Sequence, residues 1–177
     1  MLNQGKIIPI LDSRPVSRKQ SNLTPVNIEF RERKNRVALI VAPEWSPIAP
    51  PYGIARMGAI SHHSGFATKT WDLNILSRDQ GPKEYWSQYI DWKWMEPHYS
   101  EVLHPLLVPI LTPYLEEIIA WSPTIVGFSI WYTNDTCASW IAKYLKERLP
   151  DVKIIFGGPQ ATQGKLLYPD VPDHIVR

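Results

Sequence analysis

Short strand-like runs alternate with helix-like segments along most of this chain, and this alternation constrains its fold more than any other feature. The strand-like runs are either nearly continuous and apolar, as in RVALIVA, or alternate polar with apolar residues. The segments between them carry apolar residues at helical spacing. Regular alternation of strand and helix predicts a parallel sheet with helices on its faces. The expected strands are 36–42, 66–74, 124–130, 152–156 and 174–177.

The expected fold is therefore α/β, with a flavodoxin-like doubly wound parallel sheet of strand order 2-1-3-4-5. Helices are predicted at 52–64, 113–121 and 135–149, with a short helical piece at 164–168. The sheet domain is expected to cover 36–177.

Residues 75–122 are expected to form an irregular insertion rich in tryptophan and tyrosine. Prolines at 105, 109 and 113 argue against one continuous helix, because proline lacks an amide hydrogen and clashes with the preceding turn. Thr112 then fits the N-cap of a helix that begins at Pro113. The aromatic residues could form a ligand wall, an interface or a small core within the insertion.

Residues 1–35 are polar, basic and rich in turn-forming residues, so we expect an extended or disordered arm. The first 36 residues hold eight Lys or Arg and three acidic residues, which leaves a net charge of +5 on residues 1–36 and −3 on the remainder. Phe30 is the one aromatic residue among these basic side chains, so nucleic-acid binding is not expected. A contact between the arm and a protein partner remains an alternative.

Cysteine usage and hydropathy limit the classes of protein to consider. The single cysteine, Cys137, excludes an intrachain disulfide and any zinc or iron–sulfur site that needs several thiolates from this chain. The first residues lack a signal-peptide layout, and no apolar run approaches the roughly 20 residues of a membrane helix. A cytoplasmic location without membrane contact is expected.

Ligands of open α/β sheets bind outside the carboxyl ends of the strands. Here three segments follow the first, third and fourth expected strands, namely 43–52, 129–134 and 157–162. They bring flat, polar and glycine residues to one edge of the sheet. The candidate binding residues are Glu44, Trp45, Tyr52, Gly53, Ser129, Trp131, Tyr132, Asn134, Gly157, Gly158, Gln160 and Thr162.

The turn IIFGGPQAT is the most suggestive of these segments. Gly157 and Gly158 remove two Cβ atoms, so another backbone or a flat ligand could approach closely. Pro159 suits the first turn of a following helix. A tight strand-to-helix turn without a ligand fits the same residues, and Ser129 and Thr162 also suit ordinary capping.

The sequence lacks the motifs of several functional classes of α/β proteins. There is no GxxxxGK[ST] loop and no GxGxxG after the first strand, which argues against common nucleotide enzymes. The first strand ends in Pro43-Glu44 rather than in the acidic pair of a phosphoreceiver. Ser129 lacks the flanking glycines of a hydrolase nucleophile.

Three motifs together resemble a known family. PPYGIARMGAISHHSG, SPTIVGFSIWYTN and DVKIIFGGPQAT are similar, in order and spacing, to the N-terminal cobalamin-binding domain of cobalamin-dependent radical S-adenosylmethionine (radical SAM) proteins. The resemblance covers about 37–177. It implies cobalamin binding, with the corrin resting on flat side chains and the nucleotide tail passing the Gly157-Gly158 turn. In a complete protein, the cobalt would carry a methyl group to a substrate held by a radical SAM barrel.

The sequence departs from that family in two respects. Members continue into a Gly-Glu-Gly-Glu turn and a barrel with a CxxxCxxC motif, so we expect a fragment or a free-standing binding domain. An iron–sulfur cluster and S-adenosylmethionine are expected only with such a barrel, which could be a partner. No Asp-x-His-x-x-Gly follows the first strand, and His62 and His63 lie away from the expected site. The resemblance thus implies base-off cobalamin without a protein histidine, with Trp131, Tyr132 or Trp45 below the cobalt.

A non-catalytic role is the alternative. A flavodoxin-like module that has lost cofactor binding would serve as a structural or partner-binding protein, with the aromatic insertion as its interface.

Overall fold

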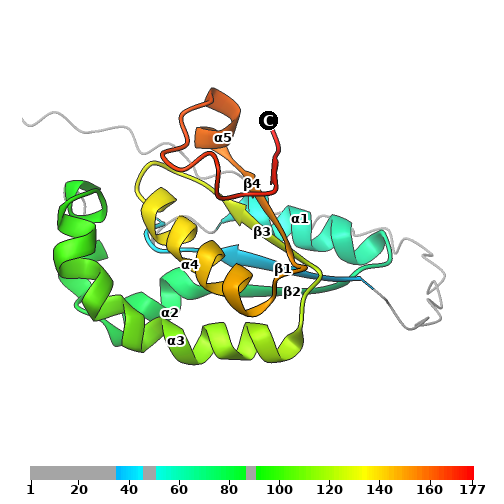
Figure 1. The fold of residues 1–177 in the computed structure, drawn as a ribbon, viewed down its shortest axis with the longest axis horizontal. Helices are drawn as coiled ribbons and strands as arrows, with labels where there is room; N and C mark the ends of the chain where they lie inside the picture. Colours follow the sequence, from blue (N-terminus) through cyan, green and yellow to red (C-terminus); the bar gives the residue numbers. More distant parts are fainter. Residues whose placement is uncertain (1–34, 46–50, 87–90) are drawn as a thin grey trace, which may run out of the picture. The chain divides into compact units, whose positions relative to one another are not determined.

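The computed structural model describes residues 35–45, 51–86 and 91–177, all within one unit, Glu32–Arg177 (Figure 1). The expected basic arm, 1–35, lies almost wholly outside the described residues and stays a prediction.

The described residues form a sheet of five parallel strands in the order β2-β1-β3-β4-β5. This confirms the predicted flavodoxin-like α/β fold and its strand order. The strands lie close to their predicted positions, with the edge strand β5 shorter than expected. Their bounds are β1 Arg36–Val41, β2 Ala67–Asp72, β3 Ile125–Ser129, β4 Lys153–Gly157 and β5 His174–Ile175.

Strand β1, which lies between β2 and β3, is buried on both faces, which explains its unbroken apolar sequence. Ala38, Ile40 and Ala42 join the large core on one face. Val37 and Leu39 join a smaller cluster on the other face.

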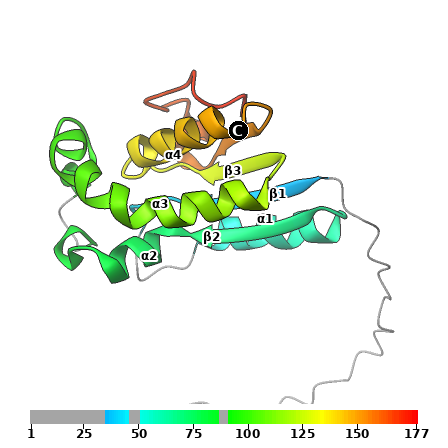
Figure 2. The same cartoon turned by 60° about the horizontal axis from the view of Figure 1, so that its bottom comes forward.

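Helices cover the two faces unequally (Figures 1 and 2). The helices α2 (Leu73–Gln80), α3 (His104–Trp121) and α4 (Asp135–Arg148) pack against the large core. Helix α1 (Tyr52–His63) lies on the opposite face and buries Ile54 in the smaller cluster. The predicted helices 52–64 and 135–149 are confirmed to within one residue.

The continuous helix α3 contradicts the expectation that prolines would break this segment. It runs through Pro109 and Pro113, and Thr112 is not an N-cap but donates its hydroxyl to the carbonyl oxygen of Val108 at 2.7 Å. Both internal prolines lie on the exposed side of the helix. The opposite side is a stripe of fully buried residues, whose burial outweighs the lost backbone hydrogen bonds. These are Leu107, Leu111, Leu115 and Ile118.

The rest of the expected insertion is also largely helical among the described residues. Helix α2 begins directly after β2, because the Asp72 carboxylate accepts the amide hydrogen of Ile75 at 3.0 Å and caps the helix. The second strand is therefore shorter than predicted. Short 3₁₀ turns at Lys83–Trp86 and Asp91–Trp94 and a π turn at Tyr99–Leu103 follow.

The described aromatic residues of this segment do not form a separate core. Trp86, Trp94 and Tyr99 are buried within the large core beneath the sheet. The indoles of Trp86 and Trp94 meet edge to face, with their centroids 5.0 Å apart. These residues anchor the segment to the body of the domain.

The helix after β4 also differs from expectation. Helix α5 is Pro159–Gln163, with Pro159 in its first turn as predicted. It ends at Gly164, whose φ of 68° is left-handed, so the predicted helical piece at 164–168 is wrong.

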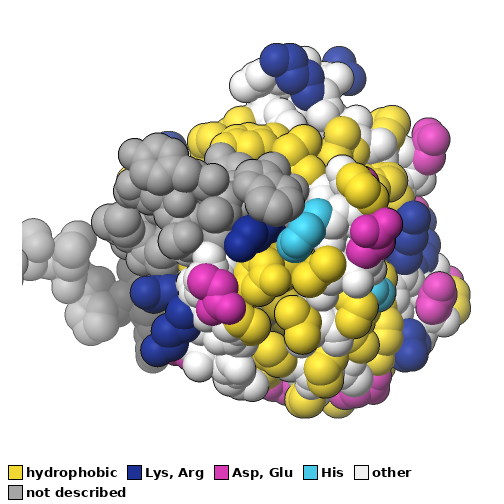
Figure 3. Space-filling view, turned by 90° about the vertical axis from the view of Figure 1, so that its left-hand side faces the viewer, with side chains coloured by type: hydrophobic (Ala, Val, Ile, Leu, Met, Phe, Trp, Pro, Cys, Tyr) yellow, Lys and Arg dark blue, Asp and Glu magenta, His cyan; other side chains and the backbone are white. Residues whose placement is uncertain are grey.

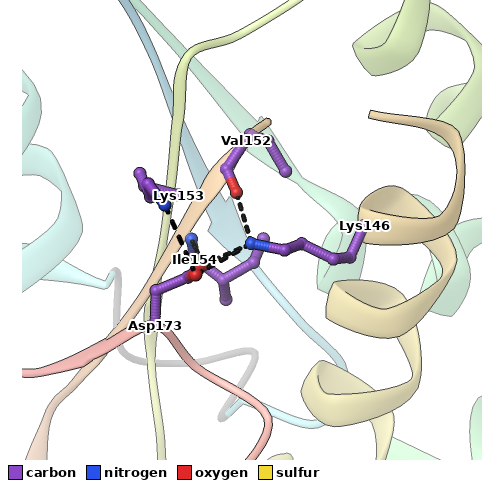
Figure 4. A network of polar contacts seen from close by, with 5 residues as sticks. All are labelled: Lys146, Val152, Lys153, Ile154 and Asp173. Atoms are coloured by element: carbon purple, nitrogen blue, oxygen red, sulfur yellow. Dashed lines mark hydrogen bonds and ion pairs between the residues drawn. The ribbon is translucent and has the colours of Figure 1, made fainter. Parts of the chain in front are cut away.

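A network around Asp173 ties β5 to the sheet (Figure 4). Its carboxylate accepts the amide hydrogen of Ile154 at 2.8 Å and the Lys146 ammonium at 2.7 Å. Lys146 also donates to the carbonyl oxygen of Val152. The Ile154 hydrogen bond, with Lys146, lowers the pKa of Asp173.

One helical stretch, Tyr99–Trp121, is long and apolar enough to cross a membrane by length and composition alone. The sequence analysis expected no apolar run of this length, because prolines interrupt it. A mostly buried core helix passes the same test; here 28% of the apolar window is buried, and its buried stripe belongs to the large core.

Candidate functional site

The three segments expected to form a site meet at the carboxyl edge of the sheet, which we call the rim. The Thr133 hydroxyl donates to the carbonyl oxygen of Glu44 at 3.1 Å and joins the segments after β3 and β1. The amide of Ile130 donates to the carbonyl oxygen of Gly157 at 2.8 Å and joins the segments after β3 and β4. The rim is thus one continuous structure, although residues 46–50 lie outside the described residues.

Asn74 fixes the segment after β1, a role that sequence reasoning missed. Its carboxamide accepts the amide hydrogen of Trp45 at 3.0 Å and donates to the Trp45 carbonyl oxygen at 2.9 Å. The same Oδ1 accepts the indole N–H of Trp86 at 2.7 Å. Asn74 is 1% exposed, so these bonds are shielded from water. The signal in the sequence was a lone polar residue within the apolar run Leu73–Leu76.

Asn134 closes the turn after β3. Its Oδ1 accepts the backbone amide hydrogen of Trp131 at 2.8 Å, and its side-chain nitrogen Nδ2 donates to the Ser129 carbonyl oxygen at 3.2 Å. The residue stands at the N-cap of α4, but its side chain makes no capping bond. Asn134 therefore shapes the rim, and the turn that it closes exposes Trp131 and Tyr132.

The outward side chains of this turn are aromatic. Trp131 is 36% exposed and Tyr132 is 42% exposed. Tyr52, at the start of α1, is 75% exposed. Seen from the side toward which β1 points, hydrophobic side chains make up much of the visible surface (Figure 3). Exposed aromatic side chains at a sheet's carboxyl edge offer flat surface to a ligand.

Gly158 is required for packing, because a side chain there would clash with the chain at the end of β3. Its φ is +93°, and a Cβ there would lie 2.7 Å from the amide nitrogen of Ile130 and 2.8 Å from the Ser129 hydroxyl oxygen. The space beside this glycine is filled by the end of β3. At Gly157, by contrast, a Cβ would make only ordinary contacts of 3.9 Å.

The remaining candidates differ in accessibility. Glu44 is 9% exposed and Trp45 is half-buried, so they line the interior of the rim. Gln160 is half-buried, and its backbone N–H donates to the Ile130 carbonyl oxygen at 3.1 Å. Gly53 and Thr162 are exposed. No finding assigns a ligand to any of the twelve candidates.

Two buried titratable groups lie next to the rim in the first turn of α4. Burial raises the pKa of Asp135, although its carboxylate accepts the amide hydrogen of Leu167 at 2.8 Å and the Ser139 hydroxyl hydrogen at 3.3 Å. Burial raises the pKa of Cys137 to about 12, which keeps the thiol unreactive at neutral pH. Within the described part of the chain, no group of three or more His, Cys, Asp or Glu side chains could hold a metal ion.

Comparisons with protein-family models, with curated proteins and with solved structures found no match.

Proposed function

We propose that this domain binds a cobalamin at the rim, in the base-off form and without a protein histidine on the cobalt. The observation that carries the proposal is the presentation of Trp131 and Tyr132 at the carboxyl end of the central strand β3. The side chain of Asn134 holds their turn in shape, so the exposed rings are pre-organised for a flat ligand. The sequence resemblance supplies the identity of that ligand.

The residues of the rim suit a corrin ring, which is a broad, largely apolar disc with amide arms. Trp131, Tyr132 and Tyr52 would give it flat surface. Ser129, Gln160 and Thr162 have polar side chains that could bond its amides or its phosphate. The nucleotide tail would pass the Gly157-Gly158 turn on a side other than the Cβ position of Gly158, which the end of β3 occupies.

The axial position would lack a protein imidazole. None of the segments 43–52, 129–134 and 157–162 contains a histidine. His62 and His63 are exposed in the last turn of α1, roughly 16 Å along the helix from its first residue, Tyr52. Trp131, Tyr132 or Trp45 would then cover the lower face of the cobalt.

The chemistry would belong to a larger assembly. Bound cobalamin supplies a methyl carrier, while this chain's residues bind it, orient it and limit its contact with water. A radical SAM domain would supply the iron–sulfur cluster and S-adenosylmethionine, because one buried cysteine cannot. We place this function in the cytoplasm.

The alternative function, partner binding without a cofactor, is favoured by a different surface. The outer side of the Tyr99–Trp121 helical stretch exposes Val102 to 37% and Leu106 to 41%. Pro105 and Pro109 are exposed on the same stretch. Adjacent exposed apolar residues are typical of a protein interface.

Reconstitution distinguishes the two functions. The chain is incubated with hydroxocobalamin at tens of micromolar, and gel filtration is monitored for corrin absorbance that elutes with the protein. We expect co-elution for the wild type and for the double variant Val102→Ser/Leu106→Ser, and at least a tenfold weaker affinity for Trp131→Ala/Tyr132→Ala. Failure of the wild type to retain the corrin, or equal retention by the rim variant, would reject the proposal.

A further inference from the structure

The outer side of the helical stretch Tyr99–Trp121, which contains α3, is apolar for about three turns (α3, Figure 2). Between Glu101 and Glu116, every exposed residue of this stretch has an apolar side chain. The spacing of these residues places them on one side of the helix, opposite the residues that pack into the large core. We call this surface the outer stripe. It consists of Val102, Pro105, Leu106, Pro109 and Pro113.

The outer stripe offers hydrogen-bond acceptors but no side-chain donors. Its valine, leucine and proline side chains carry no polar hydrogen. Proline also lacks an amide hydrogen, so Pro109 and Pro113 cannot donate to the carbonyl oxygens four residues before them. Those oxygens belong to Pro105 and Pro109, which are exposed residues of the stripe itself. Both carbonyls therefore lack the hydrogen bond of a regular helix and can accept one from a partner.

Both ends of the outer stripe are acidic. Glu101 precedes it and Glu117 follows it, and neither carboxylate forms an ion pair within the described residues. The two residues lie roughly 20–25 Å apart along the helix axis. Glu116 contributes less charge, because it lies 3.7 Å from the Arg148 guanidinium. The sequence from 94 to 142 contains no Lys or Arg, so basic groups must come from a partner.

This chemistry argues against two common occupants of an apolar surface. A second copy related by a two-fold axis would place Glu101 against its own equivalent or against Glu117, so acid would face acid in either orientation. It would also bring no side-chain donor to the two carbonyl oxygens. An anionic lipid surface would be repelled by the same glutamates, and its phosphates are acceptors as well.

We infer that the outer stripe docks an amphipathic helix of another protein, with arginine at both ends and at the centre of its apolar face. Apolar side chains of that helix would cover Val102 and Leu106, which are 37% and 41% exposed. The central guanidinium would donate to the carbonyl oxygens of Pro105 and Pro109, which are roughly 6 Å apart along the axis. The terminal guanidinium groups would pair with the glutamates at the two ends.

A helix is the expected partner because ridges on a straight helical surface pack into the grooves of another helix. The inference gives the partner's chemistry for the surface that favours partner binding. It does not rest on cobalamin binding, because the rim and the outer stripe have no residue in common.

A synthetic helical peptide of about 18 residues is the probe, a length that spans the two glutamates. It has leucine along one face and arginine at both ends and at the centre of that face, and a control peptide carries glutamate in place of arginine. Calorimetry with the full chain should show saturable one-to-one binding with a Kd on the order of 100 µM, as expected for a small, transient contact. The glutamate peptide should bind at least about tenfold more weakly, and added salt should weaken the arginine peptide.

A matched pair of variants tests the apolar part of the contact. Val102→Ser/Leu106→Ser should weaken binding of the arginine peptide at least about fivefold, because it removes the apolar side chains that the leucines cover. Met57→Ser/Ile60→Ser alters two apolar residues of α1 that are 53% and 48% exposed, and it should leave the affinity unchanged.

Pro109→Ala/Pro113→Ala tests the carbonyl acceptors. Alanine supplies the missing amide hydrogens, so the two carbonyl oxygens become paired within the helix. The variant should bind the arginine peptide about threefold or more weakly, because a hydrogen bond to a charged group is lost. Its melting temperature should equal or exceed that of the wild type, so the lost affinity would not come from unfolding.

Several results would overturn the inference. These are a wild-type chain that does not bind the arginine peptide, equal binding of the glutamate peptide, equal losses in the outer-stripe and α1 variants, and an unchanged affinity in the proline variant. Sedimentation should show a monomer, and vesicles of phosphatidylcholine and phosphatidylglycerol should not bind the chain. A dimer, or vesicle binding, that Val102→Ser/Leu106→Ser abolishes would assign the stripe to those occupants instead. That variant should retain hydroxocobalamin, so failure here is distinguishable from failure of the rim proposal.

Discussion

The indole rings of Trp45 and Trp131 meet edge to face, with their centroids 5.2 Å apart and their planes at 70°. This contact joins the segment after β1 to the segment after β3, across two neighbouring strands of the sheet. Asn74 holds Trp45 by its backbone, and Asn134 holds the turn of Trp131. The shape of the rim is therefore set by buried amides behind it, while the aromatic rings form its surface.

Asn74→Ala should destabilise the domain by about 2–4 kcal/mol, because it removes three buried hydrogen bonds, two with the Trp45 backbone and one with the Trp86 indole. Urea unfolding measures the loss. Gln80→Ala is the control; it removes an exposed amide on the same helix with its hydrogen bond to the Tyr114 hydroxyl, and it should cost about 1 kcal/mol or less. A loss at Asn74 no larger than at Gln80 would show that these bonds do not hold the rim.

Gly158→Ala should cost several kcal/mol more than Gly65→Ala. Both glycines have positive φ values, +93° and +91°, so alanine is strained at both. At Gly158 the ψ of −176° adds to this strain, because only glycine populates that region. At Gly65 no atom lies within 4 Å of the added Cβ, whereas at Gly158 the Ile130 amide nitrogen lies at 2.7 Å. Thermal unfolding of both variants measures the combined cost of strain and clash at Gly158. Equal melting temperatures would mean that the turn can move away from β3.

Asp173→Asn should lower stability at neutral pH by about 1–3 kcal/mol, because the carboxylate accepts charge-assisted bonds from Ile154 and Lys146. The pKa of Asp173 is below its usual 3.8, so its stabilisation is complete above that value and is lost as the pH falls through the lower folded value. The variant should therefore show less acid destabilisation below about pH 4.

Urea unfolding at several pH values between neutral and strongly acidic tests this effect. Lys153→Ala is the control, since that ammonium lies 3.8 Å from Asp173 and is 57% exposed, and it should cost about 0.5 kcal/mol or less. If the free energy of unfolding depends on pH in the same way in the wild type and in Asp173→Asn, the expectation is contradicted.

Asp135→Asn should raise the stability of the domain at neutral pH, in contrast to Asp173→Asn. Burial raises the pKa of Asp135, so its contribution to stability is present below the unfolded value of 3.8 and is lost as the pH rises through the higher folded value. At neutral pH the charged carboxylate costs free energy, and an amide can still accept the Leu167 amide hydrogen. We expect a gain on the order of 1 kcal/mol at pH 7 by urea unfolding. Destabilisation at pH 7 would show that the charge is needed.

The sheet could be predicted from sequence because its signals are local. Each run such as Arg36–Val41 is apolar over its own length, and alternation with helices leaves few topologies. The continuous course of α3 could not be predicted, because it depends on which side of the helix Pro109 and Pro113 occupy. Both point away from the core, which no local pattern shows.

The rim was predictable in outline only. Parallel strands bring their carboxyl ends to one edge, so the meeting of three segments follows from topology. The roles of single residues follow from contacts between distant segments. Gly158 packs against Ile130, and Asn74 bonds Trp45 and Trp86.

The most direct test of the rim proposal locates bound cobalamin by paramagnetic broadening. Cob(II)alamin carries an unpaired electron, which broadens the amide signals of nearby residues in the nuclear magnetic resonance spectrum of the labelled full chain. We predict selective broadening of residues 129–134 and 157–162, with the signals of Ser122 and Lys153, near the opposite edge of the sheet, unchanged. No broadening at saturating cob(II)alamin, or broadening centred away from the rim, would contradict the proposal.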